Sequence, residues 1–156
     1  GSVEKAVRAL MLDPDHSYQI LVVTGSNTRL YKKLRSLKKG NDKGSLHVLS
    51  FVDHIDHLMA AADIIVTKAG GMTTAEALVK GLPMLIVSPI PGHERMNTDH
   101  LVKKGAALEV TDFTRLPGLV NDLFDSKDTL DNMRKRARDL ARPDSALRIA
   151  ALAVGG

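Results

Sequence analysis

Residues 63–76 read Asp-Ile-Ile-Val-Thr-Lys-Ala-Gly-Gly-Met-Thr-Thr-Ala-Glu, so that a short apolar run leads through a glycine pair into a helix-like segment. The run 63–67 is continuous rather than alternating, as is typical of a parallel strand that is covered on both faces. A buried strand followed by a loop and a helix is the repeating unit of α/β proteins. The stretch therefore predicts a parallel sheet with helices packed against it.

Four further segments extend this pattern along the chain. The runs 19–24 and 83–88 are also continuous and apolar, whereas 46–50 and 106–110 predict weaker strands. Helix-like segments separate all five, which predicts an α/β fold: a Rossmann-like, open, doubly wound parallel sheet with helices on both faces. At 156 residues the whole chain, 1–156, is expected to form one domain.

Composition narrows the class of protein. The chain has no cysteine, which excludes disulfides, thiolate zinc sites and a cysteine nucleophile. No apolar run approaches the roughly 20 residues that span a bilayer, and no signal-peptide pattern begins the chain, so we expect a cytoplasmic location. The helix-like segment Val3 to Leu12 starts abruptly, and we expect this chain to be a fragment of a longer protein.

The net charge of +4 is concentrated in two basic runs, 29–43 and 134–142. Such runs are usually the solvated faces of helices. Aromatic residues, which stack on bases, make up only 3% of the chain. We therefore predict no nucleic-acid partner, while an anionic membrane surface stays open as one.

The carboxyl ends of parallel strands meet at one edge of a doubly wound sheet, and ligands bind there. Four loops are expected at this edge. They follow the first four predicted strands at 25–27, 51–53, 68–74 and 89–97. Any binding site is expected among them.

The third loop has two interpretations. Gly70 and Gly71 let the backbone approach a ligand, and the free N–H groups of a following helix favour a phosphate, with Lys68 adding positive charge. A helix starting near Thr73 would instead make Thr73-x-x-Glu76 a capping box, in which the two side chains satisfy backbone donors. Taken alone, the loop does not separate phosphate binding from turn chemistry.

The fourth loop, 89–97, combines two prolines and a glycine with the polar residues His93, Glu94, Arg95 and Asn97. The stiff backbone and polar side chains suit hydrogen bonding to a sugar. The alternative is that Asn97 merely caps the next helix.

A metal site was also considered at His54 and His57, which lie beside Asp53 and Asp56. Polar residues at a helix start are more often caps and solvated surface. We therefore expect no metal site.

Several motifs then occur together in one order: Phe51-Val52, Met59-Ala60-Ala61-Ala62-Asp63, 68–76, Gly81-Leu82-Pro83, and Pro91-Gly92-His93-Glu94 with Asn97. Their combination resembles the C-terminal domain of the lipid-directed GT-B glycosyltransferases. That group includes monogalactosyldiacylglycerol synthase, the processive diacylglycerol glucosyltransferases and the undecaprenyl-linked N-acetylglucosaminyltransferase of peptidoglycan synthesis. The resemblance is strong over roughly residues 46–110 and elsewhere extends only to the order of elements.

The resemblance implies that this domain binds a UDP-sugar. The residues implied in donor binding are Gly25, Asn27, Phe51, Val52, Lys68, Gly70, Gly71, Met72, Thr73, Glu76, His93, Glu94 and Asn97. Within this set, the backbone of 51–52 is expected to read the uracil edge, and the loop at 25–27 to lie beneath the base or ribose. Residues 70–73 would surround the diphosphate.

Two further roles come from the same resemblance. The carboxylate of Glu76 would accept hydrogen bonds from both ribose hydroxyls, as its two oxygens allow. His93, Glu94 and Asn97 would contact the donor sugar. The chain departs from relatives at Ala69, where many have proline, and at His93, where glutamine is common, so the identity of the sugar stays open.

The implied reaction is transfer of a hexose or N-acetylhexosamine, with inversion, to a lipid hydroxyl. Backbone amides at 70–73 would stabilise the departing UDP without a cofactor or metal. The lipid acceptor site would belong to an N-terminal domain that is absent here, in an enzyme peripheral to the membrane. We expect the fragment alone to be inactive, with His93 and Glu94 as its only catalytic candidates.

Two other functions fit the same architecture. A UDP-N-acetylglucosamine 2-epimerase shares the two-domain arrangement and the nucleotide-binding edge. A non-catalytic nucleotide-sugar-binding module acting with a partner subunit is the second alternative.

Overall fold

The computed structural model describes residues 1–13, 17–41 and 45–142, and of 38–41 only the backbone. The strands are β1 (Ile20–Val23), β2 (Leu46–Leu49), β3 (Ile65–Thr67), β4 (Met84–Val87) and β5 (Ala107–Val110). The helices are α1 (Ser2–Met11), α2 (Thr28–Asn41), α3 (Ile55–Ala61), α4 (Gly71–Val79), α5 (His93–Lys103), η1 (Phe113–Arg115, 3₁₀), α6 (Leu116–Asp125) and α7 (Lys127–Leu140). Every predicted strand is confirmed within one or two residues of its expected position.

All strand pairs are parallel, as predicted, but the strands form two ladders rather than one. β1 pairs with β2, and β4 lies between β3 and β5. Within the described residues no ladder joins β1 to β3. The two ladders nevertheless share one core, because Ile20, Leu46 and Leu85 belong to the same buried cluster.

β4 shows why a continuous apolar run folds as a central strand. Side chains of a strand alternate between faces. Leu85 and Val87 pack into one cluster with α1, α6 and α7, whereas Met84 and Ile86 pack into a second cluster with α3, α4 and α5. All four residues are buried, so helices cover both faces as the sequence predicted.

For β1 the same expectation is wrong on one face. Ile20 and Val22 point into the core, but Leu21 between them is 50% exposed. The described helices cover only one face of this strand. A continuous apolar run shows that a strand is apolar on both faces, but not that both faces are covered.

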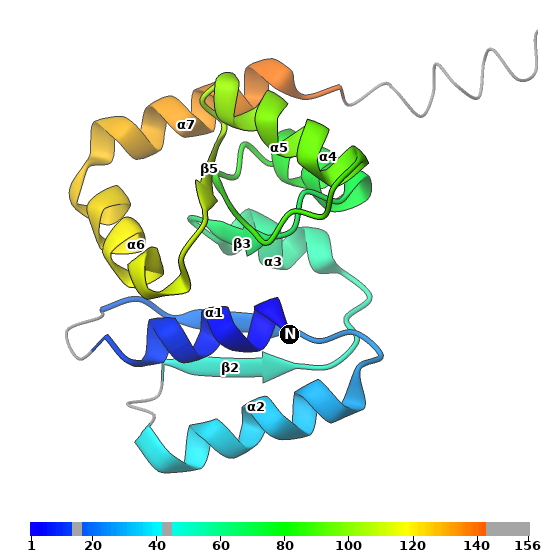
Figure 1. The fold of residues 1–156 in the computed structure, drawn as a ribbon, viewed down its shortest axis with the longest axis vertical. Coiled ribbons are helices and arrows are strands. Elements are labelled where there is room, and N and C mark those ends of the chain that lie inside the picture. The colour runs from blue at the N-terminus through cyan, green and yellow to red at the C-terminus, as the bar shows by residue number, and fades with distance from the viewer. Residues whose placement is uncertain (14–16, 42–44, 143–156) are drawn as a thin grey trace, which may run out of the picture.

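The helix-strand order places the loops that follow parallel strands at one edge of each ladder. In Figure 1 the arrow of β2 points to the right, and the loops from β1 to α2 and from β2 to α3 leave on that side. In the second ladder β3 and β4 are parallel, so the loops into α4 and α5 leave one edge of that ladder. Among the described residues, no helix is both long and apolar enough to cross a bilayer.

Candidate functional site

The loop between β3 and α4 ends in a helix start without a side-chain cap. α4 begins at Gly71, and its N-cap residue Gly70 has no side chain to accept a hydrogen bond. The N–H of Thr74 bonds the carbonyl oxygen of Gly70 at 3.0 Å, which closes the first turn. The N–H groups of residues 71–73 precede this bond and have no intrahelical acceptor. They are therefore available to an anion at the edge of the sheet.

The glycine pair is not required by the backbone of the turn. Gly70 has φ −70° and ψ 140°, which any residue adopts, and Gly71 lies in the helix. A Cβ added at either position would meet no atom within 4 Å. The glycines therefore leave open space beside the free N–H groups, which favours close approach of a ligand over turn chemistry.

The capping-box interpretation is wrong. α4 starts two residues before Thr73, so Thr73 lies inside the first turn and is not the N-cap. Thr73 and Glu76 are three residues apart on the same helix and so are neighbours on its surface. The side chain of Glu76 is exposed, and the capping box does not engage it.

Thr74, which follows Thr73 in α4, does not present its hydroxyl to a ligand at the edge of the sheet. Its side chain is buried, and its hydroxyl contacts the carbonyl oxygens of Gly70 at 2.9 Å and Gly71 at 3.0 Å. A buried hydroxyl that donates back into its own helix is not offered to a ligand. Thr73, in contrast, is partly exposed.

The loop between β4 and α5 is held by backbone geometry and by Glu94. Gly92, the N-cap of α5, has φ 102° and ψ −134°, a conformation that is essentially restricted to glycine. Ser88 has φ 47°, which is uncommon outside glycine. The carboxylate of Glu94 accepts a hydrogen bond from the N–H of Ile90 at 3.0 Å. This bond closes the loop and leaves His93, which is exposed, at the helix start.

Asn97 joins the two loops. Its side-chain amide donates to the carbonyl oxygen of Ala69 at 3.0 Å, across 28 positions of sequence. Asn97 does not cap its own helix, because α5 already begins at His93. The predicted phosphate loop and the predicted sugar loop are thus in direct contact.

A charged cluster that the sequence did not predict anchors the same helix. Arg95 donates to both carboxylate oxygens of Glu109 on β5 at 2.7 Å each, and its Nε donates to Asp99 at 2.9 Å. The hydrogen bonds from Arg95 lower the pKa of the Glu109 carboxyl below its ordinary value. The same bonds, to Glu109 and then Asp99, raise the pKa of Arg95. The sequence signal that could have indicated this cluster is Glu109, the one charged residue in the otherwise apolar run 106–110.

The remaining two loops are less constrained. Asn27 caps α2, since its side-chain oxygen accepts from the N–H of Leu30 at 2.9 Å. Gly25 lies two residues earlier and has φ 58°. Phe51, after β2, is 70% exposed, whereas Val52 beside it is partly buried.

Four exposed large apolar side chains lie in the loops and first helical turns that follow β2, β3 and β4. They are Phe51, Met72, Ile90 and Met96.

The histidines considered for a metal are stacked rather than convergent. The rings of His54 and His57 lie 5.1 Å apart between centroids, at an interplanar angle of 20°. The described part of the chain holds no group of three or more His, Cys, Asp or Glu side chains suited to a metal ion.

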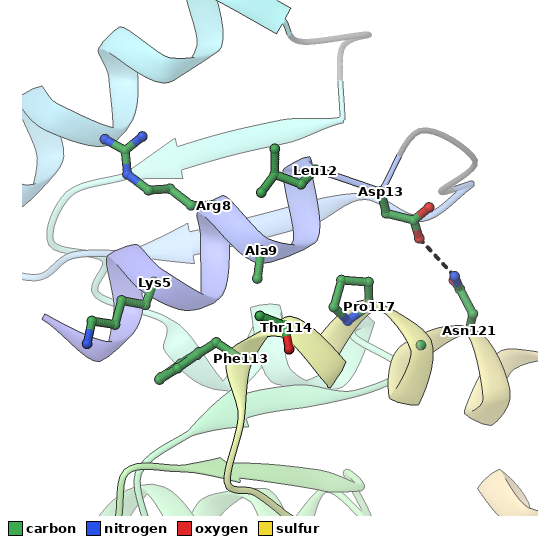
Figure 2. A pocket seen from close by; sticks show the side chains of 10 residues that line it. Lys5, Arg8, Ala9, Leu12, Asp13, Phe113, Thr114, Pro117 and Asn121 are labelled. Carbon is green, nitrogen blue, oxygen red and sulfur yellow. Dashed lines mark hydrogen bonds between the residues drawn. The ribbon is translucent and has the colours of Figure 1, made fainter.

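An open hollow of about 570 Å³ lies elsewhere, between α1 and the segment formed by η1 and α6 (Figure 2). None of the predicted site residues lines it. At one end Asn121 donates to Asp13 at 2.8 Å, and Arg8 at its margin pairs with Glu4 at 2.9 Å. Those polar groups are satisfied within the protein. The predicted site residues lie instead in or beside the loops that follow β1, β2, β3 and β4.

Comparison with known proteins gives a consistent result. Residues 2–149 match the family model described as the glycosyltransferase family 28 C-terminal domain. The chain is 37% identical over 133 residues to the processive diacylglycerol β-glucosyltransferase of Bacillus subtilis (strain 168), covering 85% of this chain and 34% of that enzyme. A relative from Bacillus cereus (strain AH187) is 31% identical over 146 residues and is covered to 37%. The chain spans about a third of the length of these curated relatives.

Among solved structures, WaaG, a glycosyltransferase involved in lipopolysaccharide biosynthesis, superposes with a TM-score of 0.73 at 20% identity, covering 99% of this chain and 44% of WaaG. Anabaena Alr3699/HepE, solved in complex with UDP-glucose, gives a TM-score of 0.68 at 17% identity, covering 88% and 39% of the two chains. The predicted Rossmann-like fold is confirmed.

Proposed function

Since this chain belongs to the family of glycosyltransferase family 28 C-terminal domains, we propose that it is the donor-binding half of a glycosyltransferase and binds a UDP-sugar. The observation that carries the proposal is the start of α4. There the N-cap is a glycine, the N–H groups are free of side-chain caps, and the glycine pair leaves space that the fold does not need.

The diphosphate is expected at residues 70–73, where the helix dipole and the backbone N–H groups favour negative charge. Lys68 is exposed and extends the positive field of this loop. Glu76, one turn further along α4 and free of the capping role, is expected to accept both ribose hydroxyls. The uracil is expected to bind the backbone of 51–52, beside the exposed side chain of Phe51.

The donor sugar is expected at the start of α5. His93 is exposed there, and the bond from Asn97 to Ala69 holds this turn against the diphosphate loop. Glu94 already accepts the N–H of Ile90 through one oxygen, so a sugar hydroxyl would bind its second oxygen. Support for UDP-glucose as donor comes from HepE, whose solved complex contains it.

Chemistry requires the rest of the protein. The proposal assigns this half the stabilisation of the departing UDP, because fixed N–H groups meet charge that develops on the diphosphate. The proposed stabilisation of UDP uses backbone N–H groups and no metal ion. The acceptor is proposed to be a lipid, as the name of the Bacillus subtilis relative indicates for that enzyme, and to bind in a second domain across the cleft.

A peripheral location at an anionic membrane is also part of the proposal. α2 begins directly after the loop at 25–27 and carries Arg29, Lys32 and Arg35 as exposed side chains. Positive charge beside the donor edge attracts an anionic lipid surface. The match to the glycosyltransferase family favours this function over a 2-epimerase.

The test is a calorimetric titration of this chain with UDP, UMP and ADP. UDP is expected to bind most tightly, because it alone supplies both the second phosphate and the uracil. Equal affinity for ADP, or no saturable binding of UDP, would contradict the proposal.

A further inference from the structure

We propose that Arg95 and Glu109 are positioning residues of the donor-sugar site: their bidentate ion pair fixes the first turn of α5 on the sheet and so keeps Asn97 bonded to the diphosphate loop. Neither residue is assigned a contact with the ligand. The expected effect on donor binding rests on the proposed function. The coupling between the Arg95–Glu109 pair and the hydrogen bond of Asn97 does not.

The first step is the position of Arg95 within α5. It lies two residues after His93 and two before Asn97, in the turn that the sugar is expected to contact. Its side chain leaves this turn and reaches β5, where the fork meets both oxygens of Glu109 at 2.7 Å. Two parallel charge-assisted hydrogen bonds define an orientation as well as a distance. The turn is therefore fixed in rotation relative to the sheet.

The second step is that the first turn of α5, residues 93–96, contributes no buried side chain to the core. Met96 is 67% exposed and His93 is exposed, so neither buries the turn in the core. The buried side chains of α5 begin at Thr98, directly after Asn97, and include Leu101. The carboxylate of Asp99, four residues on, binds Arg95 from the same helix and keeps the guanidinium aligned with Glu109.

The third step is that the hydrogen bond of Asn97 depends on the orientation of the first turn of α5 relative to the sheet. Its amide must reach the carbonyl oxygen of Ala69 at 3.0 Å, which is a directional contact between two loops. A hydrogen bond weakens steeply when its angle or distance departs from the optimum. Release of Arg95 is thus expected to weaken the bond two residues away and to uncouple the sugar loop from the diphosphate loop.

The experiment compares Arg95→Lys and Glu109→Gln with the control Arg134→Lys. Arg134 is a good control because it also bridges two carboxylates, Asp63 at 2.8 Å and Asp131 at 3.1 Å, on a part of the surface away from the predicted loops. Lysine keeps the charge but loses the fork. Thermal unfolding of all three variants measures any general loss of stability.

The first readout is NMR of the Asn97 side-chain amide and needs no ligand. Its hydrogen exchange is expected to accelerate by about three- to tenfold in both test variants, as for the loss of most of one hydrogen bond, and to stay unchanged in Arg134→Lys. The second readout is the ratio of UDP-glucose to UDP affinity. It is expected to fall in the test variants by a similar factor while UDP affinity alone is kept.

The outcomes separate the proposed donor-binding function from the positioning role of Arg95 and Glu109. If the unmodified chain binds no UDP, the proposed function fails, and the exchange of Asn97 still decides the coupling. If Asn97 exchange is unchanged in the test variants, or if UDP and UDP-glucose affinities fall in parallel with stability, the positioning role is overturned. A charge-swapped pair, Arg95→Glu with Glu109→Arg, that restores slow exchange would support it further.

Discussion

Asn97 on α5 and Ala69 at the end of the β3 loop are joined by a hydrogen bond of 3.0 Å from the asparagine amide to the alanine carbonyl oxygen. Ala69 is fully buried and directly precedes the glycine pair. The bond therefore connects the loop expected to bind the diphosphate with the helix expected to bind the sugar. Two loops that are far apart in sequence are thereby in direct contact.

Replacing Asn97 with alanine tests this connection. We expect unfolding free energy to fall by about 0.5–1.5 kcal/mol, the usual net value of one hydrogen bond, and UDP-glucose affinity to fall with it. His100→Ala on the exposed face of the same helix is the control for helix composition. Chemical denaturation and calorimetry measure both effects. If Asn97→Ala leaves both the unfolding free energy and the UDP-glucose affinity unchanged, the bond to Ala69 contributes neither to stability nor to donor binding, which contradicts the prediction.

Gly92→Ala tests the strained entry to α5. The φ of 102° is unfavourable for any residue with a Cβ, although the Cβ itself would meet no atom within 4 Å. We expect destabilisation of about 1–3 kcal/mol from the backbone alone. Gly118→Ala, inside α6, adds a Cβ in open space at a helical position and is expected to stabilise by about 0.5–1 kcal/mol. Equal thermal shifts for the two variants would refute this explanation.

Gly71→Ala separates a requirement of the ligand from one of the fold. The added Cβ meets nothing in the protein, and alanine favours the helix. Thermal stability is therefore expected to hold or rise, whereas UDP affinity falls because the Cβ occupies space beside the N–H groups. A variant that binds UDP as the unmodified chain does would remove the reason for assigning the diphosphate to this turn.

The Arg95–Glu109 pair predicts a specific dependence of stability on pH. In the folded protein the pKa of the Glu109 carboxyl is lowered from its ordinary value of 4.5. The stabilisation by Glu109 is therefore fully present above pH 4.5 and is lost as the pH falls through the lower folded-state pKa. Arg95 is hydrogen-bonded to Glu109, and the negative charge of Asp99, which itself binds Arg95, acts on Glu109 in the opposite direction. The unmodified chain should exceed Glu109→Gln in melting temperature near neutral pH, and the difference should shrink under acid. A constant difference would contradict this.

The sequence predicted the order and class of elements well because strand and helix periods are local properties. Burial was less predictable: the run in β4 is covered on both faces, but in β1 Leu21 is exposed, since coverage depends on distant helices. The start of α4 was misplaced because Thr73-x-x-Glu76 fits a capping box in isolation. The backbone instead begins the helix at Gly71.

The candidate site was predicted as a set of loops but not as a set of contacts. The resemblance implied its residues as a nucleotide-sugar site, and that role stays a prediction. The bond from Asn97 and the fork from Arg95 cross 28 and 14 positions of sequence, and no local pattern encodes them. Asn27 and Glu94 likewise have structural bonds in addition to their predicted roles.

The most direct test of the donor site is the affinity of Glu76→Ala for UDP, measured by calorimetry with circular dichroism to check the helix. Asp139→Ala, which removes an exposed carboxylate from α7, is the matched control. Loss of hydrogen bonds from two ribose hydroxyls to a carboxylate is expected to weaken binding by about tenfold or more. The variant should also lose any preference for UDP over its 2′,3′-dideoxy analogue. If Glu76→Ala binds UDP as tightly as the unmodified chain, with its helix content intact, the ribose clamp is wrong and α4 is not the centre of the donor site.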